Sequence, residues 1–223
     1  ASTALCNGSS TILTPAVNIP GGTYLWSNNE TTSTISVNPT ANANYSVTYS
    51  LNGCSSSTGA SSGNIVVNPI PTVSVNNQTI CAGQSATLTA VGSPANQGTY
   101  LWSNSSSSAS INVNPSASAT YTVTYTVNNC PSVAAVANVT VNPIPTLNIQ
   151  DTIICGGLPV TLSANPTPTG GTYLWSANAN NATTSQVTVT PASTTSYSVA
   201  YTANGCTAND NVTVTVIQNP IAN

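Results

Sequence analysis

Apolar and polar side chains alternate along short segments of the chain, which is the pattern of a β-strand with one buried face. In Tyr121-Thr122-Val123-Thr124-Tyr125, the Tyr and Val side chains fall on one face and the threonines on the other. We expect the first face to lie in a core and the second in water. In the middle third of the chain, Gly, Pro, Asn and Ser bound such segments, which predicts strands at 72–80, 85–91, 99–103, 110–114, 120–127 and 137–142.

These six short strands follow one another at about ten-residue spacing, which predicts two antiparallel sheets packed as a sandwich. No window shows the 3.6-residue period of an amphipathic helix, and Thr, Ser, Val and Asn disfavour helix interiors. We therefore expect an all-β protein.

The strand pattern occurs three times. Gly-Thr-Tyr-Leu-Trp-Ser begins at Gly22, Gly98 and Gly171, and its tryptophans are 76 and 73 positions apart. A Tyr-x-Val-x-Tyr strand follows in each copy and leads into an Asn-Gly or Asn-Asn turn that ends in a cysteine. A period of this length is that of a domain rather than of a solenoid repeat. We therefore divide the chain into three tandem domains, 1–70, 71–145 and 146–223, the first with a short or missing first strand.

The expected domains are joined by the same sequence, Val-Asn-Pro-Ile-Pro-Thr, at 67–72 and 141–146. Prolines at alternate positions favour an extended, semi-rigid connection. We expect the three sandwiches to form an elongated rod.

The composition removes most of the chemistry on which enzymes depend. The chain has no Lys, Arg or His, and its only side-chain carboxylates are Glu30, Asp151 and Asp210. A serine nucleophile needs a His or Lys base, and nucleic-acid binding normally rests on Lys and Arg. No Cys-x-x-Cys pair or acidic loop suggests zinc or calcium. We expect no enzyme activity, no catalytic, cofactor-binding or metal-binding residue, and no nucleic-acid partner.

Two further features bear on the location of the protein. No run of about 18 apolar residues occurs, so we expect no insertion into a membrane. Six cysteines at repeating positions indicate an oxidising, extracellular compartment.

The cysteines fall into an early set (Cys6, Cys81 and Cys155) and a late set (Cys54, Cys130 and Cys206). With six antiparallel strands, the early and late turns of one repeat lie at the same end of the sandwich. This predicts one bond within each repeat and no free thiol: Cys6–Cys54, Cys81–Cys130 and Cys155–Cys206. A seventh strand between Trp102 and Tyr121 would place the turns at opposite ends. The alternative links repeats through Cys54–Cys81 and Cys130–Cys155.

One tryptophan recurs at the same place in each copy, at Trp26, Trp102 and Trp175. It is either the core tryptophan on the central strand of an immunoglobulin-like sandwich or a platform on which a sugar stacks. The lack of charged partners favours the core.

The order Cys-x-Gly, Gly-Thr-Tyr-Leu-Trp-Ser, Val-Asn-Pro, Tyr-x-Val-x-Tyr and Asn-Gly-Cys resembles the immunoglobulin-like and polycystic-kidney-disease-like repeats of Bacteroidetes surface adhesins and gliding-related proteins. The resemblance covers all three copies and implies a β-sandwich array at a bacterial cell surface. The Trp-Ser-Asn segment departs from the acidic turn of the polycystic-kidney-disease family, and no ligand-binding residue carries over.

These observations predict a non-enzymatic, extracellular structural repeat protein that builds an adhesin stalk or a surface filament. The alternative is a surface module that binds carbohydrate or ice, with a surface glycan as ligand. Rows of outward threonines would suit ordered water, although they are interleaved with Ser and Asn.

Self-association is expected from the two ends of the chain. Residues 217–223 resemble the linker that elsewhere leads into a repeat, and only five residues precede Cys6. Either the neighbours are repeats of a longer chain, or the tail of one copy completes the open sheet edge of the next copy, head to tail. The assembly candidates are Ile217, Pro220 and Ile221, and deletion of 217–223 is expected to stop assembly.

Overall fold

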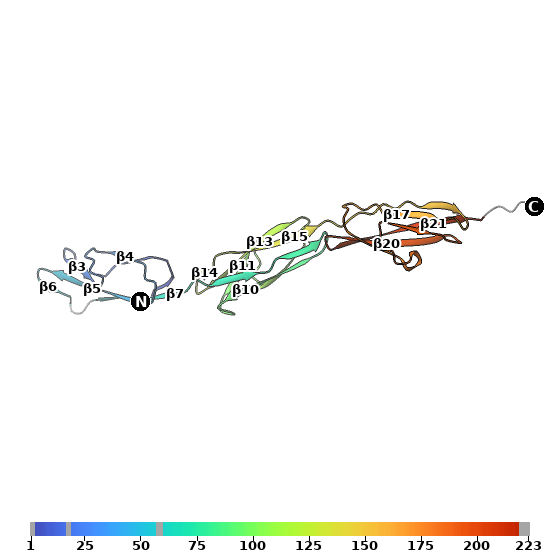
Figure 1. The fold of residues 1–223 in the computed structure, drawn as a ribbon. Helices are drawn as coiled ribbons and strands as arrows, with labels where there is room; N and C mark the ends of the chain where they lie inside the picture. Colours follow the sequence, from blue (N-terminus) through green and yellow to red (C-terminus); the bar gives the residue numbers. More distant parts are fainter. Residues whose placement is uncertain (1–2, 17–18, 57–59, 219–223) are drawn as a thin grey trace, which may run out of the picture. The chain divides into compact units, whose positions relative to one another are not determined.

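The computed structural model describes residues 3–16, 19–56 and 60–218, and it confirms the all-β class (Figure 1). One 3-10 turn, η1 (Ala177–Ala179), is the only helical element among the described residues. The strands of the first repeat are β1 (Thr3–Cys6), β2 (Thr11–Leu13), β3 (Thr23–Trp26), β4 (Ile35–Val37), β5 (Ala43–Leu51), β6 (Cys54–Ser55) and β7 (Ala60–Asn68).

Corresponding strands follow in the next two repeats, with one strand added in the second and two strands joined into one in the third. The second repeat contains β8 (Thr72–Val75), β9 (Gln78–Cys81), β10 (Ala86–Ser93), β11 (Thr99–Trp102), β12 (Ser110–Val113), β13 (Ala119–Val127), β14 (Cys130–Pro131) and β15 (Ala135–Asn142). The third contains β16 (Thr152–Cys155), β17 (Val160–Ser163), β18 (Thr172–Trp175), β19 (Gln186–Val189), β20 (Thr195–Ala203) and β21 (Cys206–Ile217).

Each repeat builds one larger and one smaller sheet. The larger sheets have the orders β1-β7-β5-β3, β9-β15-β13-β11 and β16-β21-β20-β18, and the smaller sheets are β2-β4, β8-β10-β12 and β17-β19. The order of the larger sheet is therefore the same in all three copies, whereas the smaller sheet of the second repeat has an additional strand, β8.

The chain forms two compact units. One contains Ala1–Asn76, Thr89–Ile111 and Tyr121–Val136, and the other contains Asn77–Leu88, Asn112–Thr120 and the chain from Ala137 onward. The second repeat thus contributes to both units. The division into domains 1–70, 71–145 and 146–223 stays a prediction.

The strand before each early cysteine departs from the expected antiparallel topology. It pairs in parallel with the last strand of its repeat, so that Cys6 lies opposite Asn68 and Cys155 lies opposite Ile217. In the second repeat the single strand expected at 72–80 is two strands: β8 pairs with β10 and β9 with β15. Between them, the side-chain oxygen of Asn76 accepts from the backbone N–H of Thr89 on β10, and that of Asn77 accepts from the N–H of Asn138 on β15, at 2.7 and 2.8 Å.

Hydrophobic cores fill the space between the two sheets of the outer repeats. In the first repeat, Leu13 and Ile35 of the smaller sheet pack with Trp26, Val47 and Ile65 of the larger sheet. In the third, Leu162 and Val189 of the smaller sheet pack with Trp175, Val199 and Val212 of the larger sheet. The alternation read from the sequence therefore assigns these faces correctly.

A buried tyrosine ties the larger sheet to the loop before the tryptophan strand. The Tyr201 hydroxyl donates to the Pro168 carbonyl oxygen at 2.8 Å and accepts from the Gly171 backbone N–H at 2.7 Å. Tyr125 and Tyr49 make the equivalent pairs of bonds in their repeats. One hydroxyl thus satisfies two backbone groups of a loop, which holds that loop against the sheet.

Tyr201→Phe is expected to lower the free energy of unfolding of the third repeat by about 1–3 kcal/mol, because it leaves two backbone groups without their partner. Tyr173→Phe is the matched control, since Tyr173 belongs to the same ring pair. No hydrogen bond of its hydroxyl is found within the described part of the chain, so we expect a change below about 0.5 kcal/mol. Urea unfolding followed by circular dichroism measures both, and equal effects of the two variants would contradict the role of the bonds.

Candidate assembly site at the repeat ends

The acidic side chains are tied to local donors. A carboxylate oxygen of Glu30 accepts from the Asn28 amide at 2.7 Å, and one of Asp151 accepts from the Thr213 backbone N–H at 2.8 Å. Asp210 accepts from the backbone N–H of Asn211, the next residue. Among the described residues, no group of three His, Cys, Asp or Glu side chains could hold a metal ion.

Among the described residues, no helix is both long and apolar enough to cross a lipid bilayer.

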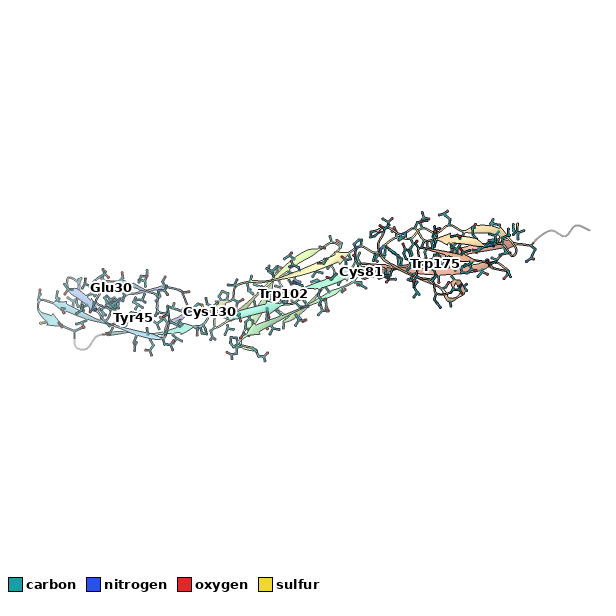
Figure 2. The ribbon with its side chains drawn as sticks, viewed as in Figure 1. Glu30, Tyr45, Cys81, Trp102, Cys130 and Trp175 are labelled. Atoms are coloured by element: carbon teal, nitrogen blue, oxygen red, sulfur yellow. A yellow bond between two sulfur atoms is a disulfide. The ribbon has the colours of Figure 1, made fainter. Side chains whose placement is uncertain are left out.

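The three tryptophans are buried, with 1%, 2% and 1% of Trp26, Trp102 and Trp175 exposed. Figure 2 labels Trp102 in the second repeat and Trp175 in the third. Each indole N–H donates to a backbone carbonyl oxygen of the following loop, at Thr32, Ser108 and Thr184. None of the three rings is therefore available as a platform for a sugar.

The disulfides join different cysteines from those expected. Cys6 is bonded to Cys130 and Cys81 to Cys206, with Cα atoms 5.5 and 5.6 Å apart. Neither bond joins the two compact units, because Cys6 and Cys130 belong to one unit and Cys81 and Cys206 belong to the other. Cys54 and Cys155 are free and exposed. The predicted pairs Cys6–Cys54, Cys81–Cys130 and Cys155–Cys206 are therefore wrong, as are the alternative across the junctions and the expectation of no free thiol.

The predicted pairs are wrong because the strand that ends in the early cysteine pairs in parallel with the last strand of its repeat. In the third repeat, Cys155 lies opposite Ile217, at the last residue of the 12-residue strand β21, and Cys206 is the first residue of that strand. At about 3.3 Å per residue, the two cysteines are separated by about 35 Å. A disulfide needs Cα atoms within about 7 Å. The early and late cysteines of one repeat therefore lie at opposite ends of the sandwich.

Each disulfide instead joins the early cysteine of one repeat to the late cysteine of the next. The late cysteine follows a two-residue hairpin turn in which both central residues have positive φ, as in a type I′ turn. These angles are 50° and 79° at Asn204 and Gly205, and 49° and 63° at Asn128 and Asn129. The cysteines just after these turns, Cys206 and Cys130, are each only 1% exposed.

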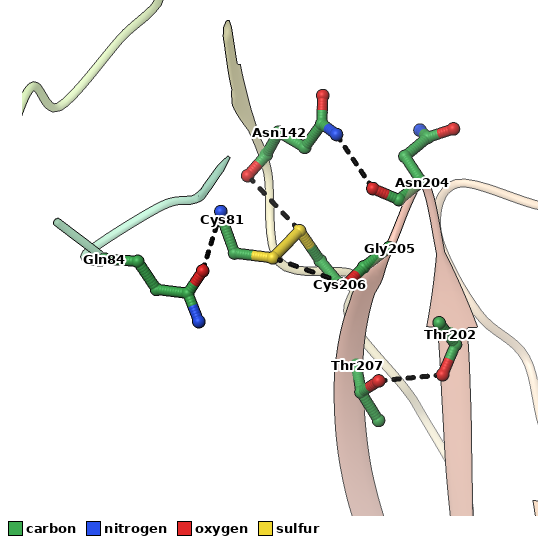
Figure 3. The surroundings of a disulfide bond; sticks show 8 residues. All are labelled: Cys81, Gln84, Asn142, Thr202, Asn204, Gly205, Cys206 and Thr207. Atoms are coloured by element: carbon green, nitrogen blue, oxygen red, sulfur yellow. Dashed lines mark hydrogen bonds between the residues drawn. A yellow bond between two sulfur atoms is a disulfide. The ribbon is translucent and has the colours of Figure 1, made fainter. Parts of the chain in front are cut away.

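The surroundings of the Cys81–Cys206 bond show how the hairpin meets the preceding repeat (Figure 3). The Asn142 side-chain amide, at the end of β15, donates to the Asn204 carbonyl oxygen at 2.8 Å. The Cys206 sulfur lies 3.8 Å from the Asn142 carbonyl oxygen, and the Cys81 sulfur lies 3.7 Å from that of Gly205. The Cys6 sulfur lies at the same 3.7 Å from the Asn129 carbonyl oxygen. A late hairpin therefore packs on an early-cysteine turn at both junctions.

Of the three residues that the sequence suggests for assembly, the structure describes only Ile217. Ile217 is the last residue of β21, 56% of it is exposed, and its carbonyl oxygen accepts from the Gly156 backbone N–H at 3.0 Å. Pro220 and Ile221 lie outside the described residues.

No family model matches the chain, and no curated protein matches it. Among solved structures, a variant of a three-domain immunoglobulin fragment of titin is 12% identical, with a TM-score of 0.50, and the match covers 97% of this chain and 96% of that one. Extracellular domains 3–5 of Drosophila OTK are 10% identical, with a TM-score of 0.41 and coverage of 97% and 94%. The titin match shows the fold: this chain consists of tandem immunoglobulin-like domains.

Proposed function

We propose that this chain is a non-enzymatic structural repeat of an extracellular array, which assembles head to tail into a stalk or filament at a bacterial surface. The observation that carries the proposal is the disulfide pattern, because each disulfide links two successive repeats rather than two cysteines of the same repeat. Disulfides persist in oxidising compartments, which supports an extracellular location. The sequence resemblance to Bacteroidetes surface repeats supports the bacterial host.

A disulfide between repeats suits a protein that is subject to a pulling force. The segment Pro69–Pro71 and the Cys6–Cys130 bond both connect the first repeat to the second. A pulling force is therefore shared between a backbone linker and a covalent cross-link close to the sandwich ends. An uncharged surface supports the stacking of copies, since the whole chain carries a formal charge of only −3 and self-repulsion is small.

Assembly by the tail can be tested by truncation. Ile217 belongs to β21 and pairs with Cys155, so a deletion that begins at Ile217 would disturb the sheet. We therefore delete Gln218–Asn223, which removes the tail and keeps this pairing. The full chain is expected to form fibres by negative-stain electron microscopy and to sediment with increasing mass as its concentration rises. The truncated chain is expected to keep its circular dichroism spectrum and sediment as a monomer.

Fibres from the truncated chain would contradict a role for the tail. A full chain that remains a monodisperse 22.4 kDa species at high concentration under oxidising conditions would overturn the proposed assembly itself.

A further inference from the structure

We propose that Cys155 of one copy and Cys54 of a second copy of this chain form a disulfide, which continues the Cys6–Cys130 and Cys81–Cys206 pattern across the boundary between copies. The proposal rests on the head-to-tail assembly proposed above and names the bond that locks it.

The first argument is the pairing pattern. Within the chain, the early cysteine of each repeat is bonded to the late cysteine of the repeat that follows. By this pattern Cys155 needs a late cysteine from a following repeat, and Cys54 needs an early cysteine from a preceding one. These are the two cysteines that the structure leaves free, and both are exposed. The two free thiols are thus of opposite kinds, one early and one late.

The second argument is that the backbone presents Cys155 in the same way as the bonded Cys6 and Cys81. All three end a four-residue strand that pairs in parallel with the last strand of the repeat. All three carbonyl oxygens accept from the N–H three residues later, at 2.9, 3.0 and 3.3 Å for Cys6, Cys81 and Cys155. The glycine two residues after each cysteine has a φ of 84°, 82° and 79°. The turn that holds an early cysteine is therefore already formed at Cys155.

The third argument is that Cys54 sits in the same hairpin as the bonded late cysteines. It follows Asn52 and Gly53, whose φ values of 50° and 81° match those of the turn before Cys206. It pairs with Leu51 across the turn, as Cys206 pairs with Ala203. Cys206 is nevertheless buried, whereas Cys54 is exposed. Since the hairpins are alike, the difference comes from the early-cysteine turn that covers Cys206, and the same cover would bury Cys54.

One contact at this junction differs from the Cys81–Cys206 junction. The residue opposite the early cysteine is Asn142 in the second repeat, where its amide donates to the hairpin, but it is Ile217 in the third repeat. The junction between copies therefore lacks that hydrogen bond. The exposed Ile217 takes the place of Asn142 opposite the early cysteine, so we expect an apolar contact there instead.

The bond forms by exchange with a disulfide oxidant such as oxidised glutathione. The Cys155 thiolate attacks the oxidant and releases one glutathione thiol, and the Cys54 thiolate of the second copy attacks the mixed disulfide and releases the other. Two protein thiols lose two electrons and two protons, and the oxidant is reduced to two thiols. The contact joins two different surfaces, so unless it closes into a ring it propagates as a filament.

The test uses the full chain and its Cys54→Ser and Cys155→Ser variants in an oxidised and reduced glutathione buffer, resolved by non-reducing electrophoresis. Chymotryptic peptides are then mapped by mass spectrometry, because the chain has no Lys or Arg for trypsin. The unchanged chain is expected to give a ladder of covalent oligomers that contain a Cys155–Cys54 peptide. An equimolar mixture of the two single variants is expected to give a covalent dimer with that same peptide and no longer species. The double variant, which keeps both internal disulfides, is expected to give no ladder.

Oligomers linked mainly through Cys54–Cys54 or Cys155–Cys155, or a monomer with Cys54 bonded to Cys155 of its own chain, would overturn the proposal. So would a chain whose two thiols stay fully alkylatable after oxidation at high concentration. Microscopy of the same samples separates the two proposals. Fibres without the Cys155–Cys54 peptide would reject the bond and leave head-to-tail assembly standing, whereas unlinked monomers without fibres would reject both.

Discussion

Removing the Cys81–Cys206 disulfide, by the double substitution Cys81→Ser and Cys206→Ser, is expected to lower the free energy of unfolding by about 5 kcal/mol. The bond joins residues 125 positions apart, and in the chain-entropy model a loop of that length restricts the unfolded chain by about this amount. Both cysteines lie in the same compact unit, so the loss should appear in the unfolding of that unit. Guanidinium unfolding followed by circular dichroism measures the change.

The control is the double substitution Cys54→Ser and Cys155→Ser, which removes two exposed thiols and keeps both disulfides. We expect this variant to unfold within about 0.5 kcal/mol of the unchanged chain, as surface substitutions usually do. If the first variant unfolds at the same denaturant concentration as this control, the Cys81–Cys206 bond does not stabilise the protein in solution.

Trp175→Ala is expected to destabilise the third repeat by about 3–5 kcal/mol, the usual cost of truncating a buried aromatic side chain. The ring is 1% exposed and packs in the core with Leu162, Val199 and Val212. The change also leaves the Thr184 carbonyl oxygen without the indole N–H that donates to it at 2.9 Å. Differential scanning calorimetry measures the shift, and the fluorescence of Trp26 and Trp102 reports on the other repeats.

Leu174→Ala is the matched control, since Leu174 is the neighbouring residue on β18 but is 54% exposed. We expect it to change stability by less than about 0.5 kcal/mol. Equal destabilisation by the two variants would mean that the burial of Trp175 does not matter. Complete unfolding of all three repeats by Trp175→Ala would show that the repeats do not fold separately.

Several features of this protein could be predicted from the sequence because they depend on neighbouring residues. Side-chain alternation depends only on the two-residue period of a strand, so it places Trp102 and Val123 inside and Thr122 and Thr124 on the outer face. Asn204-Gly205 predicts a two-residue hairpin turn because both central positions require positive φ. The absence of Lys, Arg and His is a property of composition alone.

The disulfide pattern could not be predicted, because it depends on which strand pairs with which and in what direction. A segment such as Thr152–Cys155 has the same alternation whether it lies antiparallel or parallel to β21, and only the second choice places Cys155 beside Ile217, at the far end from Cys206. The sequence by itself determined three all-β repeats, their hairpins and the buried tryptophans, since local periodicity and turn chemistry specify these. The tertiary structure alone decided that cysteines bond between repeats and that Cys54 and Cys155 remain free, since strand direction is set by contacts between residues far apart in the chain.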